Sequence, residues 1–231
     1  MKSVREFWKK VWNEKAKSDN IFVQIGRSSY TPLEFLLMLK DIVDVLEFQS
    51  EDVVLDVGGG VGWTSMYISP YVKEITLFDY AEEMVNKAKE KTKHFGNIRV
   101  FLDDLLYMGK VRDRRYNKVI VGSVLQYLEN YEQVEKALYN VYDVMLPRGK
   151  VMFLHNPDVR KKEAYIKSYN GLNWSQERVK KALEGEEMRL WLDIRKVEEA
   201  AYKFGFSKCY ETPINPKLWQ STHMFDLAVE K

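Results

Sequence analysis

The chain of 231 residues contains one cysteine, Cys209. A single cysteine cannot form an intramolecular disulfide, and it cannot supply a multi-cysteine zinc or iron–sulfur site. We therefore expect no metal site. The absence of a disulfide framework favours a reducing compartment and predicts a cytoplasmic protein. Cys209 itself is interpreted as a core residue.

Long apolar runs and an excess of one charge are also missing. No run approaches the roughly 18 apolar residues of a membrane-spanning helix, and residues 1–8 lack the apolar core of a signal peptide. The 36 Lys and Arg nearly balance the 34 Asp and Glu. A dedicated nucleic-acid binder needs a clear excess of basic residues. We therefore expect no transmembrane segment and no nucleic-acid partner.

What the sequence does contain is an alternation of β-branched runs with helical periodicity. Strands are predicted at 53–57, 74–79, 98–102, 118–122, 150–154, 208–212 and 224–230. Helices are predicted at 3–17, 32–47, 81–93, 131–145 and 193–204. Such alternation implies crossover units and a mostly parallel sheet. Residues 213–222 join the last two strands, and that length also allows those strands to pair antiparallel.

The first predicted helix, residues 3–17, carries Phe7, Trp8 and Trp12 at helical spacing, with lysines on its other face. Three interpretations stay open. The helix packs on its own domain, it is a lid over a ligand, or it lies on a membrane surface.

Residues 158–190 interrupt the alternation with a polar and aromatic stretch, which predicts an inserted helical lid. Trp174, Trp191 and Trp219 are candidates for the wall of an apolar substrate pocket, or simple core anchors. A basic cluster in residues 110–118 precedes the fourth strand, at the amino-end edge of the sheet. We interpret it as a solvated loop on the face opposite the expected site.

The segment Asp56-Val57-Gly58-Gly59-Gly60-Val61-Gly62 joins the first strand to a helix. Glycines there let backbone N–H groups approach a ligand. The dinucleotide fingerprint would need a third glycine where Trp63 or Ser65 stands. The phosphate-binding P-loop would need a lysine after Gly62, and none is present.

The segment 53–62 resembles motif I of class I S-adenosylmethionine-dependent methyltransferases. Asp79 closes the second strand 23 residues after Asp56, and Asp104 follows the third strand. Residues 116–128 are similar to the family's fourth-strand motif, and residues 146–150 to its turn into the fifth strand. The resemblance covers about residues 50–155 and, loosely, 192–231. Asn117 departs from it, because an Asp is common there.

The resemblance implies an α/β fold. This fold is a three-layer αβα sandwich with a mostly parallel seven-stranded sheet of order 3-2-1-4-5-7-6, the last strand antiparallel. We expect a single domain over 1–231. Within it, 1–48 would be N-terminal helices or a cap, 49–157 the donor-binding core, 158–191 a substrate-lid insert, and 192–231 the C-terminal helix and strand pair.

The resemblance also implies that the chain binds S-adenosyl-L-methionine and releases S-adenosyl-L-homocysteine. Asp79 would bind the ribose hydroxyls and Asp104 the adenine amine, since an ionised carboxylate only accepts hydrogen bonds. Asp56 would help bind the ammonium group, and the glycine amides the carboxylate. Asp103 stands where the family has a small residue, so either aspartate could face adenine, and the register favours Asp104. The predicted binding residues are Asp56, Gly58, Gly59, Gly60, Gly62, Asp79, Tyr80, Asp103, Asp104, Leu105, Ser123 and Gln126.

Methyl transfer needs a general base only if the acceptor must lose a proton. His155 ends the fifth strand and His223 precedes the last strand, so either could serve, and His155 is the better candidate. Tyr127, after the fourth strand, is expected beside the donor sulfur. The alternative interpretations for these residues are strand-end hydrogen bonding and packing.

We expect a methyltransferase acting on a small or medium-sized acceptor, such as a metabolite or a glycan or lipid intermediate, as a monomer or homodimer. The alternatives are a NAD-dependent oxidoreductase on a related sheet and a non-catalytic S-adenosylmethionine-binding module. An RNA or protein acceptor is ranked lower.

Overall fold

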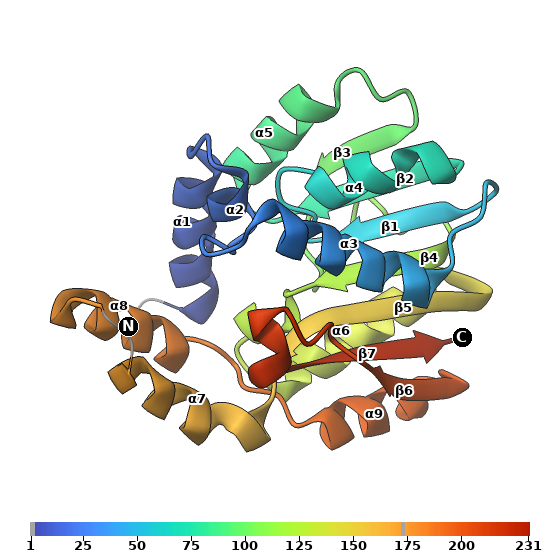
Figure 1. The fold of residues 1–231 in the computed structure, drawn as a ribbon. Coiled ribbons are helices and arrows are strands. Elements are labelled where there is room, and N and C mark those ends of the chain that lie inside the picture. Colours follow the sequence, from blue (N-terminus) through green and yellow to red (C-terminus); the bar gives the residue numbers. More distant parts are fainter. Residues whose placement is uncertain (1–2, 172–173) are drawn as a thin grey trace.

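The computed structural model describes residues 3–171 and 174–231. It has three layers, with α3 (Pro32–Leu46) and α4 (Trp63–Ile68) in front of the sheet and α6 (Tyr131–Val144) and α9 (Ile194–Lys203) behind it (Figure 1). This is the predicted αβα sandwich.

The sheet has the predicted order β3-β2-β1-β4-β5-β7-β6. The first five strands run parallel, and β7 pairs antiparallel with β5 and β6. The strands are β1 (Val53–Val57), β2 (Glu74–Asp79), β3 (Ile98–Leu102), β4 (Tyr116–Gly122), β5 (Met145–Pro157), β6 (Lys208–Thr212) and β7 (Met224–Glu230). β5 is longer than predicted at both ends. Its pairing with β7 shifts register between Phe153 and Asn156, where His155 has a left-handed backbone (φ 55°).

The core lies on both faces of the sheet. Valines of β1 and β4 alternate sides, as period-two strands require. Val54 and Ile120 pack under Ile42 of α3, whereas Val57 and Val121 belong to the larger cluster that includes α6 and α9. Thr31 and Glu34 form the capping box predicted for α3, which fixes where that helix starts.

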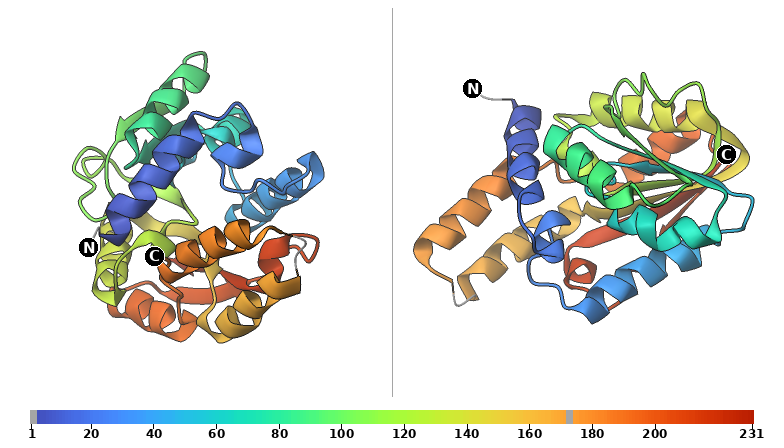
Figure 2. Two further views of the ribbon diagram at one scale, coloured as in Figure 1. Left: turned by 90° about the vertical axis from the view of Figure 1, so that its left-hand side faces the viewer. Right: turned by 90° about the horizontal axis from the view of Figure 1, so that it is seen from above.

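The N-terminal helix α1 (Val4–Ala16) lies across the carboxyl ends of the parallel strands (Figures 1 and 2). It continues through the short α2 (Ile21–Gln24) into α3. The insert after β5 contains α7 (Lys162–Ser168) and α8 (Gln176–Glu187), which project at the same end of the molecule. The remaining α-helix, α5 (Glu82–Thr92), contacts β2 and β3.

The basic cluster lies in the β3–β4 loop, and ion pairs hold part of it. Arg114 pairs with Glu74 at the start of β2, and the Arg112 guanidinium lies 3.3 Å from the Asp143 carboxylate. These pairs place residues 112–114 near the amino ends of the strands, whereas the start of the same loop, at Asp104, lies at the carboxyl ends and contacts α1. Cys209 on β6 is half-buried at the edge of the core.

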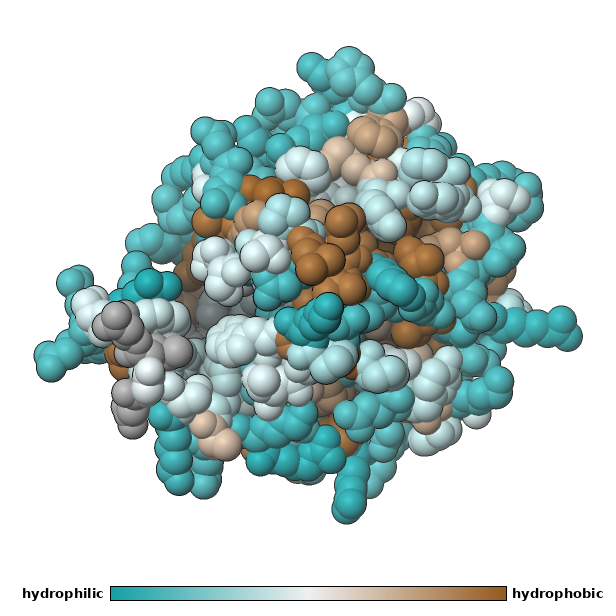
Figure 3. Space-filling model, in the orientation of Figure 1, coloured by the Kyte–Doolittle hydropathy of each residue, from teal (hydrophilic) through white to brown (hydrophobic). Residues whose placement is uncertain are grey.

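The surface over α3 is partly apolar, and brown side chains gather there in Figure 3, where Leu33 and Leu36 are more than half exposed. No helix among the described residues is both long enough and apolar enough to cross a membrane.

Candidate functional site

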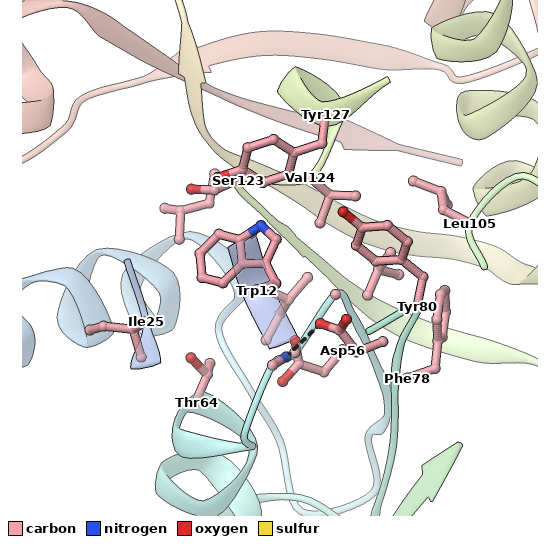
Figure 4. Close-up of a pocket in the computed structure, with 18 of the residues that line it drawn as sticks. Trp12, Ile25, Asp56, Thr64, Phe78, Tyr80, Leu105, Ser123, Val124 and Tyr127 are labelled. Carbon is pink, nitrogen blue, oxygen red and sulfur yellow. Dashed lines mark hydrogen bonds between the residues drawn. The ribbon is translucent and has the colours of Figure 1, made fainter. Parts of the chain in front are cut away.

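A pocket opens at the carboxyl ends of β1, β2 and β4, beneath α1. Its walls come from the β1–α4 turn, the ends of β2 and β4, the segment after β3, and the segment 24–27 after α2. Figure 4 shows the rings of Trp12, Tyr80 and Tyr127 and the carboxylate of Asp56 around this space. We refer below to its Asp104 end (Tyr80, Asp103, Asp104 and Leu105) and its Arg27 end (Arg27, Ser123, Tyr127 and His155).

The glycine turn forms the floor of the pocket. Gly58, Gly59 and Gly60 line it, and Gly58 has φ +65°. An added Cβ on Gly58 would lie 2.4 Å from Val124 Cγ2, so only glycine fits between β1 and β4 at this point. Gly62 does not line the pocket. It caps α4 at φ +89° and packs close to Thr92 and Leu77, so its role here is helix packing.

Asp56 and Asp79 are buried carboxylates beside this turn. Ser65 Oγ donates to Asp56 Oδ2 over 2.6 Å. The N–H groups of Gly60 (3.1 Å) and Ala81 (2.8 Å) donate to Asp79. Burial raises the pKa of each aspartate to about 6, despite these bonds. Both carboxyl groups are therefore mostly ionised at neutral pH and lack a cationic partner among the described residues.

The two aspartates after β3 have different environments. Asp103 accepts from the N–H groups of Asp104, Gly109 and Lys110, so its carboxylate holds its own loop together. Asp104 accepts from Leu106 N–H over 2.8 Å and pairs with the Arg5 guanidinium of α1. Asp104 is thus the aspartate whose carboxylate meets a donor from across the pocket.

Helix α1 caps the pocket. Arg5 and Trp12 line it, and the Arg5 guanidinium lies 5.9 Å from the centroid of the Tyr80 ring. Trp8 is buried against Tyr127, with ring centroids 4.6 Å apart, and its Nε1 donates to Met188 O. Packing and a lid-like position therefore coexist in this helix.

At the Arg27 end, one guanidinium connects three segments. Arg27 Nη2 donates to Ser123 Oγ over 2.7 Å and lies 3.1 Å from His155 Nδ1. His155 is fully buried and lines the pocket. Burial first, and then the Arg27 charge, lowers the pKa of His155 well below its usual value.

The short helix η2 (Leu125–Tyr127) places Tyr127 in the pocket and turns its neighbour away. Gln126 is buried outside the pocket, and its Nε2 donates to Ser123 O over 3.0 Å. Burial raises the pKa of Tyr127. The structure thus does not bring Gln126 to the site.

His223 also lies outside the pocket lining. Its ring stacks on Tyr165 of α7, with centroids 4.0 Å apart, next to Trp219. Trp191 and Trp174 belong to the same aromatic cluster with Tyr169, which packs the insert onto the core. None of these three tryptophans lines the pocket.

Six other predicted site residues do line the pocket: Asp56, Asp79, Tyr80, Leu105, Ser123 and Tyr127. The sequence reasoning missed Arg5, Gln24, Arg27, Thr64 and Val124. In the structure Gly26, the residue before Arg27, has φ +71°, and the Trp12 ring fills the position of its missing Cβ. That contact brings the segment after α2 against α1.

Comparisons with known proteins agree with this arrangement. Residues 54–149 match the family described as "Methyltransferase domain". Nodulation protein S of Sinorhizobium fredii is 23% identical over 99 residues, which are 43% of this chain and 45% of that protein. Ribosomal RNA small subunit methyltransferase A of Leuconostoc mesenteroides is 28% identical over 83 residues, 36% of this chain and 27% of that protein. The chain thus matches less than half the length of these curated relatives.

Solved structures share the whole fold. The N-methyltransferase NodS from Bradyrhizobium japonicum WM9, in complex with S-adenosyl-L-homocysteine, has a TM-score of 0.68 at 14% identity, covering 96% of this chain and 97% of that one. Magnesium protoporphyrin IX methyltransferase from Synechocystis PCC 6803 has a TM-score of 0.68 at 15% identity, covering 98% and 99%. Residues 54–149 thus match a methyltransferase domain, and the strand order and these likenesses show that the chain has the fold of class I S-adenosylmethionine-dependent methyltransferases.

Proposed function

We propose that this chain is an enzyme that transfers the methyl group of S-adenosylmethionine to a small-molecule acceptor. The observation that carries this proposal is the linear order of chemical groups along one pocket. Asp104 follows β3, Asp79 ends β2, Asp56 and the glycine turn end β1, and Ser123 and Tyr127 follow β4, and these strands adjoin in that order in the sheet.

The residues present fit the donor. A ribose diol offers two O–H donors, which the ionised Asp79 can accept, and the adenine amine suits Asp104 in the same way. Tyr80 and Leu105 supply apolar surface for the adenine ring. At the other end, Asp56 suits an ammonium group. Arg27 and the turn amides suit a carboxylate.

The sulfonium of the donor supplies an already activated methyl group, so the work of the chain is alignment and exclusion of water. Holding two reactants in line contributes about 7–11 kcal/mol in favourable cases. Tyr127, packed against Trp8 and Trp12, forms a wall at the end where the sulfur would lie. Ser123, fixed by Arg27, forms a second wall.

A small acceptor is favoured because α1 covers the pocket. Trp12 lines the roof, and Trp8 ties α1 to the end of the insert through its bond to Met188 O. Two further similarities support this preference, since NodS is named an N-methyltransferase and the Synechocystis protein a magnesium protoporphyrin IX methyltransferase.

The first test is selective stabilisation. Saturation at 100 times the dissociation constant should add about 2.7 kcal/mol to the free energy of unfolding. S-adenosylmethionine and S-adenosylhomocysteine should raise the melting temperature, and NAD should not. A larger shift with NAD would favour the oxidoreductase and contradict the proposal.

The second test concerns transfer. The chain is incubated with methyl-labelled S-adenosylmethionine and either a small-molecule extract or total RNA from the same cells. Label in the small-molecule fraction is expected. Label confined to RNA would refute the acceptor class, and donor binding without transfer to either would favour a binding module.

A further inference from the structure

The Arg27 end of the pocket offers hydrogen-bond donors where a base was predicted. A guanidinium can only donate, so His155 Nδ1 must accept from Arg27. A neutral imidazole then carries its proton on Nε2. This Nε2 is buried and has no hydrogen-bond partner among the described residues. His155 therefore presents an unused N–H group, which is suited to bind an electron-rich acceptor and not to remove a proton.

Two further cations lie around the same end. The Arg189 guanidinium lies 6.0 Å from the Trp8 ring, which packs on Tyr127. Lys15 Nζ lies 4.4 Å from the Trp12 ring, and a Cβ on Gly26, the residue before Arg27, would lie 3.4 Å from it. Burial first, and then the charges of Arg27 and Arg189, lowers the pKa of Lys15 to about 8. The three cations therefore lie within electrostatic reach of one another.

Carboxylates do not balance this charge. Arg189 pairs with Glu186 at 3.3 Å, whereas no carboxylate among the described residues lies within 4.0 Å of Lys15 or Arg27. Asp226 lies behind His155 and accepts its backbone N–H. Burial raises the pKa of Asp226 to about 8, so it is mostly protonated at pH 7. Glu186 is the one carboxylate paired with these three cations, and the ionised Asp79 also acts on Tyr127 from beside the glycine turn, so three cations against two anions leave a surplus of positive charge beside Tyr127.

The donor does not supply the missing negative charge. Its methionine end carries one carboxylate, one ammonium and the sulfonium, so its own net charge is positive. The carboxylate can satisfy Arg27, and Asp56 can satisfy the ammonium. Lys15, Arg189 and the sulfonium would then face only Glu186. Partly buried charges are costly unless they are paired, so the second ligand of this pocket is the remaining source of an anion.

We propose, on the basis of the proposed function, that the methyl acceptor is an organic anion. Its carboxylate or phosphate group lies against Arg189 and Lys15, beside Trp12 and Tyr127. His155 Nε2–H serves as a hydrogen-bond donor to the acceptor. The positive end of the pocket thereby selects anionic acceptors over neutral ones of the same shape.

The test uses two fluorescent probes that differ by one charge, anilinonaphthalene sulfonate and its uncharged parent phenylnaphthylamine. Both are titrated onto the full chain saturated with S-adenosylhomocysteine. We expect the anionic probe to bind about tenfold tighter than the neutral one, as for a charge-assisted hydrogen bond. Arg189→Met should remove most of that preference, and Lys15→Met part of it. Lys181→Met, on the exposed face of α8, should leave it unchanged.

Arg189→Met removes the ion-pair partner of the buried Glu186 and could destabilise the fold. Lys15→Met and Arg189→Lys test the preference for the anionic probe while the Glu186 carboxylate keeps a cationic partner. Arg189→Lys should keep the preference within about threefold. Displacement of the anionic probe by benzoate or by phenyl phosphate then distinguishes a carboxylate from a phosphate acceptor. Equal affinity for the two probes, or a preference that both Met variants at Arg189 and Lys15 retain, would overturn the inference. If the wild-type chain fails to bind S-adenosylhomocysteine, the proposed function fails as well.

Discussion

The two ends of the pocket use opposite chemistry. The buried Asp79 and the partly exposed Asp104 mark the path toward one end, where both accept hydrogen bonds. Arg27 and the buried His155 mark the other, where Arg27 donates to Ser123 and His155, and His155 keeps an unpartnered Nε2. A ligand with hydroxyl and amine donors suits the first end, and an anion suits the second. The contrast indicates how one cavity can hold two different molecules in a fixed order.

The ends also differ in how the chain supplies their residues. The carboxylates follow strands directly, so the sheet fixes their positions. Arg5, Trp12 and Arg27 come from α1 and the segment after α2, which cross the sheet from outside. The sheet therefore fixes the carboxylates of the first end, with Arg5 of α1 beside Asp104, whereas the second end takes Arg27 from the segment after α2.

The largest expected effect concerns Asp79. Asp79→Ala removes the acceptor for both ribose hydroxyls, each bond to a charged group contributing about 1.5–3 kcal/mol. The dissociation constant of S-adenosylhomocysteine, measured by isothermal titration calorimetry, should rise at least about 100-fold. Asp113→Ala, at an exposed aspartate of the β3–β4 loop, should leave it unchanged. If the Asp79→Ala variant binds S-adenosylhomocysteine as tightly as wild type, Asp79 does not bind the ribose hydroxyls.

The glycine turn joins the two ends, and Gly58→Ala should distort it. The new Cβ would lie 2.4 Å from Val124 Cγ2 at φ +65°, so the free energy of unfolding should fall by about 1–3 kcal/mol. Gly122→Ala is the matched control, because its Cβ would meet nothing within 4 Å. Urea denaturation measures both variants, and equal losses would contradict this view of the turn.

The pH dependence of S-adenosylhomocysteine binding tests whether the ligand needs the ionised carboxylates of Asp56 and Asp79. The pKa values of Asp56 and Asp79 are raised to about 6, and the ligand binds the ionised carboxylates. Their ionised fraction falls as the pH falls through that value. The affinity for S-adenosylhomocysteine should therefore drop about tenfold for each group one pH unit below its pKa. Calorimetry from about pH 7.5 to about pH 5 measures this drop, and a flat profile would argue against both carboxylates.

The smallest expected effect has the opposite sign. The Arg5 guanidinium occupies Asp104 and lies over Tyr80, where adenine would bind. A partly exposed ion pair contributes about 0–1 kcal/mol, so Arg5→Ala should tighten S-adenosylhomocysteine binding up to about fivefold. Lys9→Ala, an exposed position of the same helix, is the control. Weaker binding in Arg5→Ala would show that Arg5 holds the ligand and does not compete with it.

The sheet could be predicted because its signals are local. The β-branched runs at Val53–Val57 and Tyr116–Gly122 and the capping box at Thr31 follow from neighbouring residues alone. The strand order came from the resemblance and is confirmed. The carboxylates at Asp56, Asp79 and Asp104 reach the pocket for the same reason, since each follows or ends a strand.

The Arg27 end could not be predicted in the same way. Arg27 is 96 residues from Ser123 and 128 from His155, and no periodic pattern links them. Gln126 and Tyr127 are neighbours in η2, yet Tyr127 lines the pocket and Gln126 does not. His223 precedes β7 at the correct end of the sheet, yet Tyr165 of the insert stacks on its ring and keeps it in the aromatic cluster. Tertiary packing decided each of these positions.

The most direct measurement of the central claim is a crystal structure of the chain with S-adenosylhomocysteine. The ribose hydroxyls should bond to Asp79, the adenine amine to Asp104 with Arg5 displaced, and the carboxylate to Arg27. The sulfur should then lie beside Tyr127, at the end of the pocket nearest to Arg189 and Lys15. A ligand bound in the reverse direction, or with its carboxylate at the Asp104 end, would contradict the division of the pocket into a carboxylate end and a cationic end.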